Sequence, residues 1–264
     1  MNKKKKFSQI VRDIKSVKIQ GARNIARAAL KAYSLVPTKA SKKRLLDSRP
    51  TEPMMENVLE LAEKTKDYKK ILKHFDEAQN KINKKVCKLM KNKDVIFTHC
   101  HSTNVINALI YAKKKGRMFE VYNTETRPLF QGRKTARELR KAGIKVTMFV
   151  DSALGVALSK KQGTKKATKV FLGADAITSK GIINKVGSET IVRIAKQEKI
   201  PVYVMADSWK FTNKKLLLEN RKLNEVWGKA PKGIKIKNPA FEFVPKKFVK
   251  KVITEEGKYL KISN

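Results

Sequence analysis

Cysteine is scarce in this 264-residue chain, and no long apolar segment is present. The two cysteines, Cys87 and Cys100, cannot build a disulfide framework, so we expect a protein of a reducing compartment. No apolar run reaches the roughly eighteen residues that a membrane-spanning helix needs. No apolar segment follows the basic start at residues 3–6, so we expect no signal peptide. These absences exclude a secreted disulfide scaffold and a membrane protein, and they predict a cytoplasmic location.

Motifs for cofactors, metals and specific nucleic-acid sequences are also missing. The sequence contains no Gly-rich nucleotide fingerprint, no spaced set of metal ligands, no helix-turn-helix and no aromatic RNA-binding signature. We therefore expect no cofactor and no metal.

Basic residues, in contrast, are abundant. Lys and Arg together number 62 against 23 acidic residues, which gives a formal net charge of +39. Such a charge attracts phosphate backbones. However, only 12 of the 62 are Arg, the residue suited to bidentate base contacts, and the basic residues are spread along the whole chain. The composition predicts nonspecific nucleic-acid binding that salt weakens.

Residues 123–133, Asn-Thr-Glu-Thr-Arg-Pro-Leu-Phe-Gln-Gly-Arg, carry the most information. An apolar segment over 118–122 predicts a strand before this run, and residues 134–142 predict a helix after it. In open α/β sheets ligands bind outside the carboxyl ends of the strands. This turn is therefore a candidate site, although a capped turn with a surface ion pair would have the same composition.

Three more apolar runs end at polar residues. They begin at Val95, Val170 and Val202, and they end near Cys100, Asp175 and Lys210. Helical patterns alternate with these runs, over residues 105–114, 152–159 and 188–198, and a further strand is expected over 145–150. The alternation predicts a Rossmann-like, mostly parallel sheet whose two faces are both covered by helices.

The first part of the chain has no strand signal. Apolar residues recur at helical spacing over 10–17, 25–32, 54–62 and 68–90. We expect a small helical domain over residues 1–91, followed by the α/β domain over residues 92–264.

Several motifs in this order resemble one superfamily. They occupy residues 123–133, 135–139, 150–153, 173–177 and 184–187. The superfamily contains the alpha, beta and delta subunits of the nucleotide-exchange factor for translation initiation factor two. It also contains two sugar-phosphate isomerases, which act on methylthioribose 1-phosphate and, in archaea, on ribose 1,5-bisphosphate. The resemblance extends from about residue 19 to residue 211.

The resemblance implies roles for two residues. Thr98-His99-Cys100-His101-Ser102 is similar to the Thr-His-Cys-Asn-Ser of the isomerases, in which the Cys accepts a proton from sugar carbon-2. Asp175 matches the Gly-Ala-Asp carboxylate that protonates the ring oxygen as the sugar opens. A buried structural Cys and a turn-capping Asp are the alternatives. The translation-factor subunits also carry Gly-Ala-Asp, so Cys100 is the more discriminating of the two.

Further residues match phosphate-binding positions. Ser208-Trp209-Lys210-Phe211 resembles the Ser-x-Lys-Phe of ribose-1,5-bisphosphate isomerases, where the Lys holds a phosphate, although translation-factor relatives can share it. A methylthio group would not need this cation. The other substrate-binding candidates are Arg49, Ser102, Thr103, Arg127, Asn184 and Lys185.

One motif departs from the isomerase pattern. Where the isomerases have Arg-Gly-Ala, this chain has Gln20-Gly21-Ala22 followed by Arg23. Gly21 and Ala22 keep a close backbone approach to a phosphate. With Gln20 in place of Arg, the motif has one positive charge fewer than in the isomerases, and the guanidinium of Arg23 is a candidate to supply that charge.

The sequence thus predicts an aldose–ketose isomerase for ribose 1,5-bisphosphate, in an archaeal route of nucleoside monophosphate degradation. The alternative is a related, non-catalytic subunit that binds nucleotide or sugar phosphate in the same cleft. The resemblance and the apolar tail also predict a homo-oligomer, a dimer or an assembly of dimers. The tail residues in question are Phe241, Phe243, Val244, Phe248 and Val252.

Overall fold

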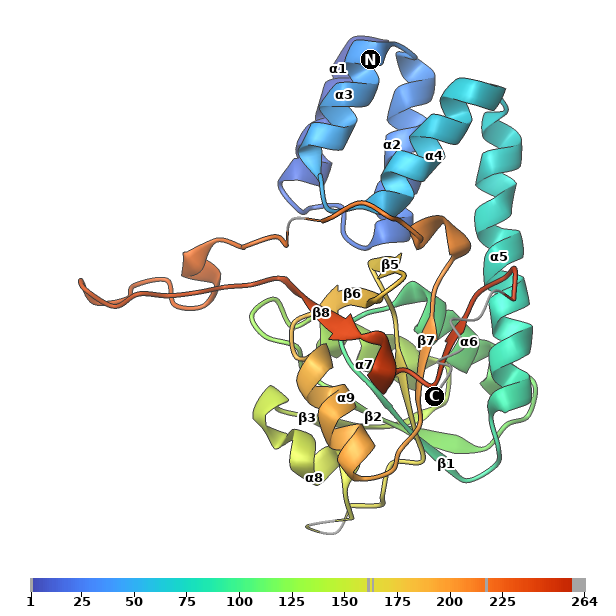
Figure 1. Cartoon of the computed structure of the whole chain (residues 1–264), viewed down its shortest axis with the longest axis vertical. Coiled ribbons are helices and arrows are strands. Elements are labelled where there is room, and N and C mark those ends of the chain that lie inside the picture. Colours follow the sequence, from blue (N-terminus) through green and yellow to red (C-terminus); the bar gives the residue numbers. More distant parts are fainter. Residues whose placement is uncertain (1, 161, 163, 217, 258–264) are drawn as a thin grey trace.

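The structure is a computed structural model that describes residues 2–160, 162, 164–216 and 218–257. Five helices come first in the chain: α1 (Lys3–Lys15), α2 (Ala22–Leu35), α3 (Lys39–Ser48), α4 (Pro53–Thr65) and α5 (Tyr68–Leu89). Figure 1 shows α1 to α4 as a bundle at one end of the molecule, while the long helix α5 runs from this bundle down the side of the sheet.

The bundle closes around one apolar cluster. Ile25 and Ala29 of α2 and Met55 and Val58 of α4 are fully buried in it, as their helical spacing predicts. Helix α3 was not among the predicted helices. Leu45 is its one buried apolar side chain, because Lys and Ser occupy most of its other positions.

The central sheet has six strands in the order β3-β2-β1-β4-β7-β9, and the paired strands run parallel. These strands are β1 (Asp94–Thr98), β2 (Phe119–Thr124), β3 (Lys145–Phe149), β4 (Lys169–Leu172), β7 (Val202–Met205) and β9 (Lys251–Ile253). The helices between them are α6 (Thr103–Lys114), α7 (Gln131–Lys141), α8 (Leu154–Leu158) and α9 (Ser188–Gln197).

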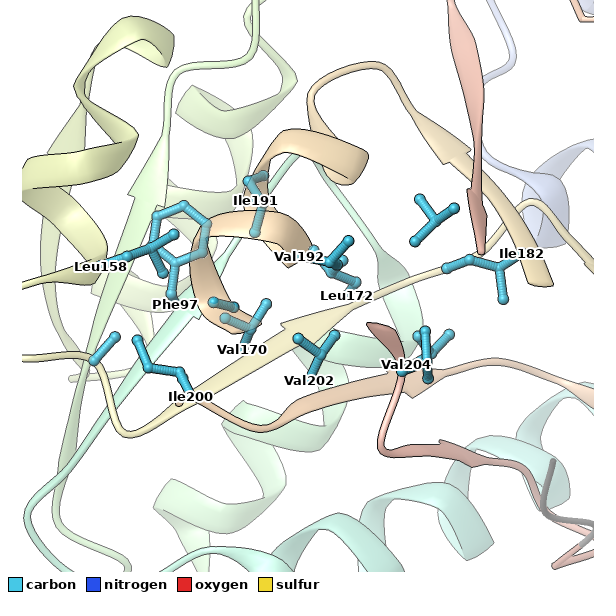
Figure 2. Packing of buried hydrophobic residues seen from close by; sticks show 14 of the residues in the cluster. Phe97, Leu158, Val170, Leu172, Ile182, Ile191, Val192, Ile200, Val202 and Val204 are labelled. Carbon is cyan, nitrogen blue, oxygen red and sulfur yellow. The ribbon is translucent and has the colours of Figure 1, made fainter. Parts of the chain in front are cut away.

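Both faces of the central strands of this sheet are buried. Figure 2 shows Val170 and Leu172 of β4 packed with Ile191 of α9 on one face. Phe171, between them in sequence, belongs to the opposite cluster with Leu109 of α6. Alternate side chains point to opposite faces, and both faces are apolar, which explains the uninterrupted apolar runs. The predicted α/β fold with a parallel, Rossmann-like sheet and helices on both faces is confirmed.

Helix α5 contributes to both halves of the molecule. Ile71 and Phe75 in its first half pack in the cluster of the helical bundle. Ile82 and Val86 in its second half pack with α6 against the sheet. The division of the chain at residue 91 stays a prediction.

A second, antiparallel sheet was not predicted. It consists of β5 (Ala176–Thr178), β6 (Gly181–Lys185) and β8 (Phe241–Pro245). Val244 of β8 and Val252 of β9 are buried within this chain's own core. These two residues are therefore not available for an oligomer interface, contrary to their place in the predicted apolar tail.

Part of the chain between η2 (Ser208–Lys210) and β8 leaves the body of the protein. Figure 1 shows it as the orange-to-red stretch that extends away from the sheet. We call residues 221–238 of this stretch the arm. Its base is held by backbone hydrogen bonds from Arg221 N to Asn238 O (2.8 Å) and from Ala240 N to Glu219 O (2.8 Å).

Within the described part of the chain, none of the helices combines the length and the apolar character that crossing a membrane requires.

Candidate active site

A cavity lies at the carboxyl ends of β1, β2 and β4, where these ends approach the helical bundle. The bundle contributes residues 17 and 20–24, together with Arg49 and Glu52. The α/β part contributes residues 99–104, 128–129, 131, 134, 173–175, 184–185, 210, 219, 221, 225 and 240–241. All the predicted site residues except Arg127 line this cavity.

Cys100 occupies the first turn after β1, in a left-handed conformation with φ of +65°. Such a conformation is strained for a residue with a side chain and needs support from its surroundings. Two threonines supply this support. Thr126 Oγ1 accepts a hydrogen bond from Cys100 N (3.0 Å), and Thr135 Oγ1 donates one to Cys100 O (2.7 Å).

The run 123–133 builds the frame behind this turn. Asn123 and Thr124 are fully buried, and Asn123 Nδ2 donates to Gly132 O (2.9 Å). A Cβ atom at Gly132 would lie 1.7 Å from Thr124 O, so only glycine fits there. Pro128, Leu129 and Gln131 reach the cavity. Most of the run therefore has a structural role, and it fixes the backbone on which Cys100 sits.

Both histidines that flank Cys100 are uncharged at neutral pH. Burial lowers the pKa of His99 to about 4 and that of His101 to about 4. His99 Nε2 donates to Val186 O (2.9 Å), so its Nδ1 accepts from Thr124 Oγ1. Since Thr135 Oγ1 gives its proton to Cys100 O, His101 Nδ1 donates to Thr135 Oγ1 (3.2 Å). Neither imidazole supplies a positive charge to the thiol.

Burial raises the pKa of the Cys100 thiol to about 12. The Lys185 ammonium and a hydrogen bond from the backbone N–H of His101 oppose this shift, because both favour the thiolate. Asp175 and Asp151 add to the shift through their negative charge. In the free protein the thiol therefore keeps its proton at neutral pH.

Asp175 lies just beyond β4, where its backbone N–H donates to Ile183 O (2.8 Å) and starts the second sheet. Burial raises the pKa of its carboxyl, while the cations of Lys210, Arg49 and Lys185 act in the opposite direction. A raised pKa is the property that a general acid needs near neutral pH.

Three cations face this carboxyl from three parts of the fold. Arg49 follows α3, Lys185 ends β6, and Lys210 ends η2; all three are buried. Lys210 Nζ donates to Ala174 O (2.6 Å). Arg49 Nη2 pairs with Glu219 (2.9 Å) and with Glu52 (3.4 Å). Among the described residues, Arg49 Nε and Nη1 are buried without a hydrogen-bond acceptor. An unsatisfied buried guanidinium is costly, and it indicates an anionic ligand.

Helix N-termini form other parts of the wall. Gly21 caps α2 with φ of +84°, and Ala22 begins that helix. Ser102 caps α6, and Thr103 begins it. Gly173 is required opposite Ser102, because a Cβ atom there would lie 2.4 Å from Ser102 Oγ. Backbone N–H groups at such ends favour anions.

The remaining candidates are placed as follows. Asn184 Nδ2 donates to Ser188 Oγ (2.9 Å), which orients the amide beside Lys185. Gln20 lines the cavity. Arg23 also lines it, but its guanidinium pairs with Asp76 (2.6 Å). Arg127 does not reach the cavity, and its Nη2 donates to Val226 O of the arm (3.2 Å).

Several lining residues were not among the predicted site residues, and four of them form a charged group. They are the carboxyls Glu52, Glu219 and Glu225 and the guanidinium of Arg221. Arg221 pairs with Glu225 (2.5 Å) and Glu219 (3.3 Å). Of these four, only Glu52 could have been predicted from local spacing, because it follows Arg49 by three residues and an ion pair at that spacing is common.

One group among the described residues has a spacing that could hold a metal ion: His74, Asp207 and Glu255. Its atoms are engaged elsewhere. Asp207 Oδ1 accepts from Trp209 N (2.9 Å), and Glu255 accepts from Ser208 N (3.0 Å). The His74 ring stacks on Trp209 with 3.6 Å between centroids. These contacts join α5 to η2, and they give the group a structural role.

The chain is similar to several known proteins. The ribose 1,5-bisphosphate isomerase of Methanocaldococcus jannaschii is 34% identical, with 92% of this chain and 88% of that protein covered. A putative translation initiation factor eIF-2B subunit 2-like protein of Pyrococcus furiosus is 28% identical, with 96% and 95% covered. The crystal structure of the Pyrococcus horikoshii translation initiation factor eIF-2B superposes with a TM-score of 0.85 at 25% identity, over 97% of each chain.

The superfamily resemblance seen in the motifs is thereby confirmed. The model of the Initiation factor 2 subunit family matches residues 18–260, and the chain belongs to this family.

Proposed function

We propose that this chain is an aldose–ketose isomerase that converts ribose 1,5-bisphosphate to ribulose 1,5-bisphosphate in nucleoside monophosphate degradation. Relatives named ribose 1,5-bisphosphate isomerase, which align over nearly the whole chain, support this assignment. The observation that carries it is the position of Cys100 and Asp175. They come from two different strand ends and line one cavity with three buried cations.

In the proposed reaction, Asp175 gives its proton to the ring oxygen as the bond between that oxygen and carbon-1 breaks. Cys100 removes the proton from carbon-2, and the electrons of that C–H bond form the carbon-1 to carbon-2 double bond of a phosphoenolate. A proton added at carbon-1 and the loss of the proton on O2 then give the ketone. The chemistry needs one acid and one base, and no electron acceptor.

Cys100 can act as the base only if its surroundings stabilise the thiolate. Because the pKa of Cys100 is about 12 in the free protein, the thiolate must be stabilised when substrate is bound. Lys185 and the His101 N–H are the two groups that favour the thiolate. Closure of the cavity around substrate would strengthen both interactions by excluding water.

Formation of ribulose 1,5-bisphosphate by the purified protein tests the proposal. Cys100→Ser and Asp175→Asn should each lower turnover by at least about a hundredfold, because general acid–base groups contribute about 10²–10⁴-fold. Cys87→Ser is the matched control, since Cys87 lies on α5 away from the cavity, and it should keep wild-type turnover. Near wild-type turnover of either cavity variant would contradict the mechanism.

A second function is a binding subunit without turnover. The similarity to the eIF-2B-like protein and to the eIF-2B structure favours it. The same cavity would then hold a nucleotide or a sugar phosphate. Saturable binding of ribose 1,5-bisphosphate or of a nucleoside monophosphate, with no isomerisation under any condition, would reject the isomerase and favour the binding subunit.

We also propose that the protein is a homo-dimer or an assembly of dimers. The arm supports this, because Leu223, Val226, Trp227 and Ile234 expose 39–51% of their surface on it. Exposed apolar groups of this kind are typical of surfaces that a partner covers.

A further inference from the structure

The charges around Asp175 are balanced. Three cations, Arg49, Lys185 and Lys210, influence this carboxyl, and Glu219 opposes them. Glu52 faces the same Arg49, Lys210 and Glu219, and it faces Asp175 itself. If every group of this set is ionised, three positive charges meet three negative ones. A phosphate dianion would then enter a region without net positive charge.

Glu52 is the member of this set with the least favourable surroundings for a negative charge. It stands at the start of α4, and only 3% of its surface is exposed. Its Oε1 accepts a long hydrogen bond from Arg49 Nη2 (3.4 Å). Its Oε2 is buried without a hydrogen-bond partner among the described residues. A buried carboxylate with a free oxygen is costly, so a proton on this group is favoured.

The electrostatic environment agrees with this geometry. Burial and the negative charge of Asp175 raise the pKa of Glu52 to about 8, although Arg49 and Lys210 favour the ionised form. Burial raises the pKa of Asp175 as well. Two neighbouring carboxyls that are poorly solvated cannot both ionise easily.

We propose that Glu52 and Asp175 influence each other through their charges, and that an anion binds in this cavity together with a proton on Glu52. With Glu52 neutral, the set has an excess positive charge, and the unpaired Nε and Nη1 of Arg49 are free to bind the anion. The anion in turn disfavours ionisation of both carboxyls, which keeps Asp175 in the acid form that the proposed isomerase needs. Glu52 is thus a positioning residue, and the proposal deepens the proposed function at the same site.

Sulfate is the appropriate probe, because it stays a dianion over the whole useful pH range and no turnover is involved. Its dissociation constant is measured by calorimetry between pH 6.5 and 9.5 at constant ionic strength. For the wild type it should be nearly constant up to about pH 8, the pKa of Glu52, and then rise about tenfold per pH unit. Three groups that line the same cavity, His99, His101 and Cys100, do not titrate in this range, since the pKa values of His99 and His101 are about 4 and that of Cys100 is about 12.

Glu52→Gln should abolish this rise, so that sulfate affinity changes by less than about threefold from pH 6.5 to 9.5. Glu242→Gln is the matched control. Burial raises the pKa of Glu242 too, but this carboxyl accepts from Glu189 N outside the cavity, and its variant should keep the wild-type rise. The proposal is refuted if the dissociation constant of Glu52→Gln rises with pH as much as that of the wild type. It is also refuted if the wild type does not bind sulfate, or binds it equally at every pH.

Asp175→Asn provides a second test that does not depend on the folding of the Glu52 variant. Removal of the neighbouring negative charge should lower the pKa of Glu52, so the affinity should begin to fall at a lower pH. An unchanged midpoint in Asp175→Asn would mean that the two carboxyls are not coupled. A wild-type protein that has no isomerase activity but shows the expected sulfate profile would reject only the proposed reaction, so the two failures can be distinguished.

Discussion

Burial acts on Cys100 and Asp175 in the same direction, although the proposed reaction needs them in opposite roles. It raises the pKa of both groups and so favours a carboxylic acid and a thiol. This suits Asp175 as an acid and opposes Cys100 as a base. The buried cations oppose burial at both groups, because Lys185 favours the thiolate, and Lys210, Arg49 and Lys185 favour ionised Asp175.

Lys210 provides a test at the scale of one residue. In the free protein its ammonium donates to Ala174 O, next to Asp175. If it also binds a substrate phosphate, Lys210→Ala should raise KM more than it lowers kcat, with a loss of about 1.5–3 kcal/mol for a charged hydrogen bond. Loss of this cation should also raise the pKa of Asp175 further. Steady-state kinetics with ribose 1,5-bisphosphate measures the effect.

Lys214→Ala serves as the control, because Lys214 is exposed and pairs with Glu56 outside the cavity. It should leave both constants unchanged. If Lys210→Ala saturates with substrate as the wild type does, Lys210 has no contact with the phosphate.

At the scale of elements, the turn from β2 to α7 supports the turn after β1. Thr135 of α7 is buried and donates to Cys100 O (2.7 Å), which holds the left-handed conformation of Cys100. Thr135→Val keeps the shape but leaves this carbonyl without its donor. The free energy of unfolding should fall by about 1–3 kcal/mol, and turnover should fall as Cys100 moves.

Urea unfolding and turnover, measured on the same samples, check this prediction. Thr147→Val is the matched control, since Thr147 is exposed on β3, and it should change neither quantity. A Thr135→Val protein with wild-type stability and turnover would show that the turn keeps its conformation without this bond.

The sequence predicted these elements unevenly, and the reasons are physical. The strands β1, β4 and β7 are buried along their whole length and apolar in their central residues because both faces of the sheet are covered there, so their position and their polar ends could be predicted. The strands β5 and β9 have three residues each, too few to show any period. Glu52 and Glu219 meet Asp175 only through the fold, so no spacing could indicate that all three share one cavity. Cys100 and Asp175 were found through the resemblance of their motifs.

At the scale of the whole molecule, charge and apolar surface act in opposite directions on self-association. Each chain carries a formal charge of +39, so two copies repel each other, and salt screens this repulsion. The exposed apolar residues of the arm favour contact between two copies. Nonspecific nucleic-acid binding should respond to salt in the opposite way and become weaker as salt rises, because it depends on the attraction of the same positive charge to phosphates.

We therefore expect a dimer whose dissociation constant falls as salt is raised from about 0.05 to about 0.5 M. Trp227, half exposed on the arm, is the largest apolar group there. Trp227→Ser should weaken the dimer at least about tenfold, because loss of a buried aromatic contact at an interface commonly costs more than about 1.4 kcal/mol. Met118→Ser removes an apolar side chain that is more exposed than Trp227 and lies just before β2, away from the arm, and it should have no effect. Sedimentation velocity at micromolar concentration measures all three proteins. A single 30.1 kDa species for the wild type at both salt concentrations would reject the dimer, and equal effects of the two substitutions would place the interface elsewhere.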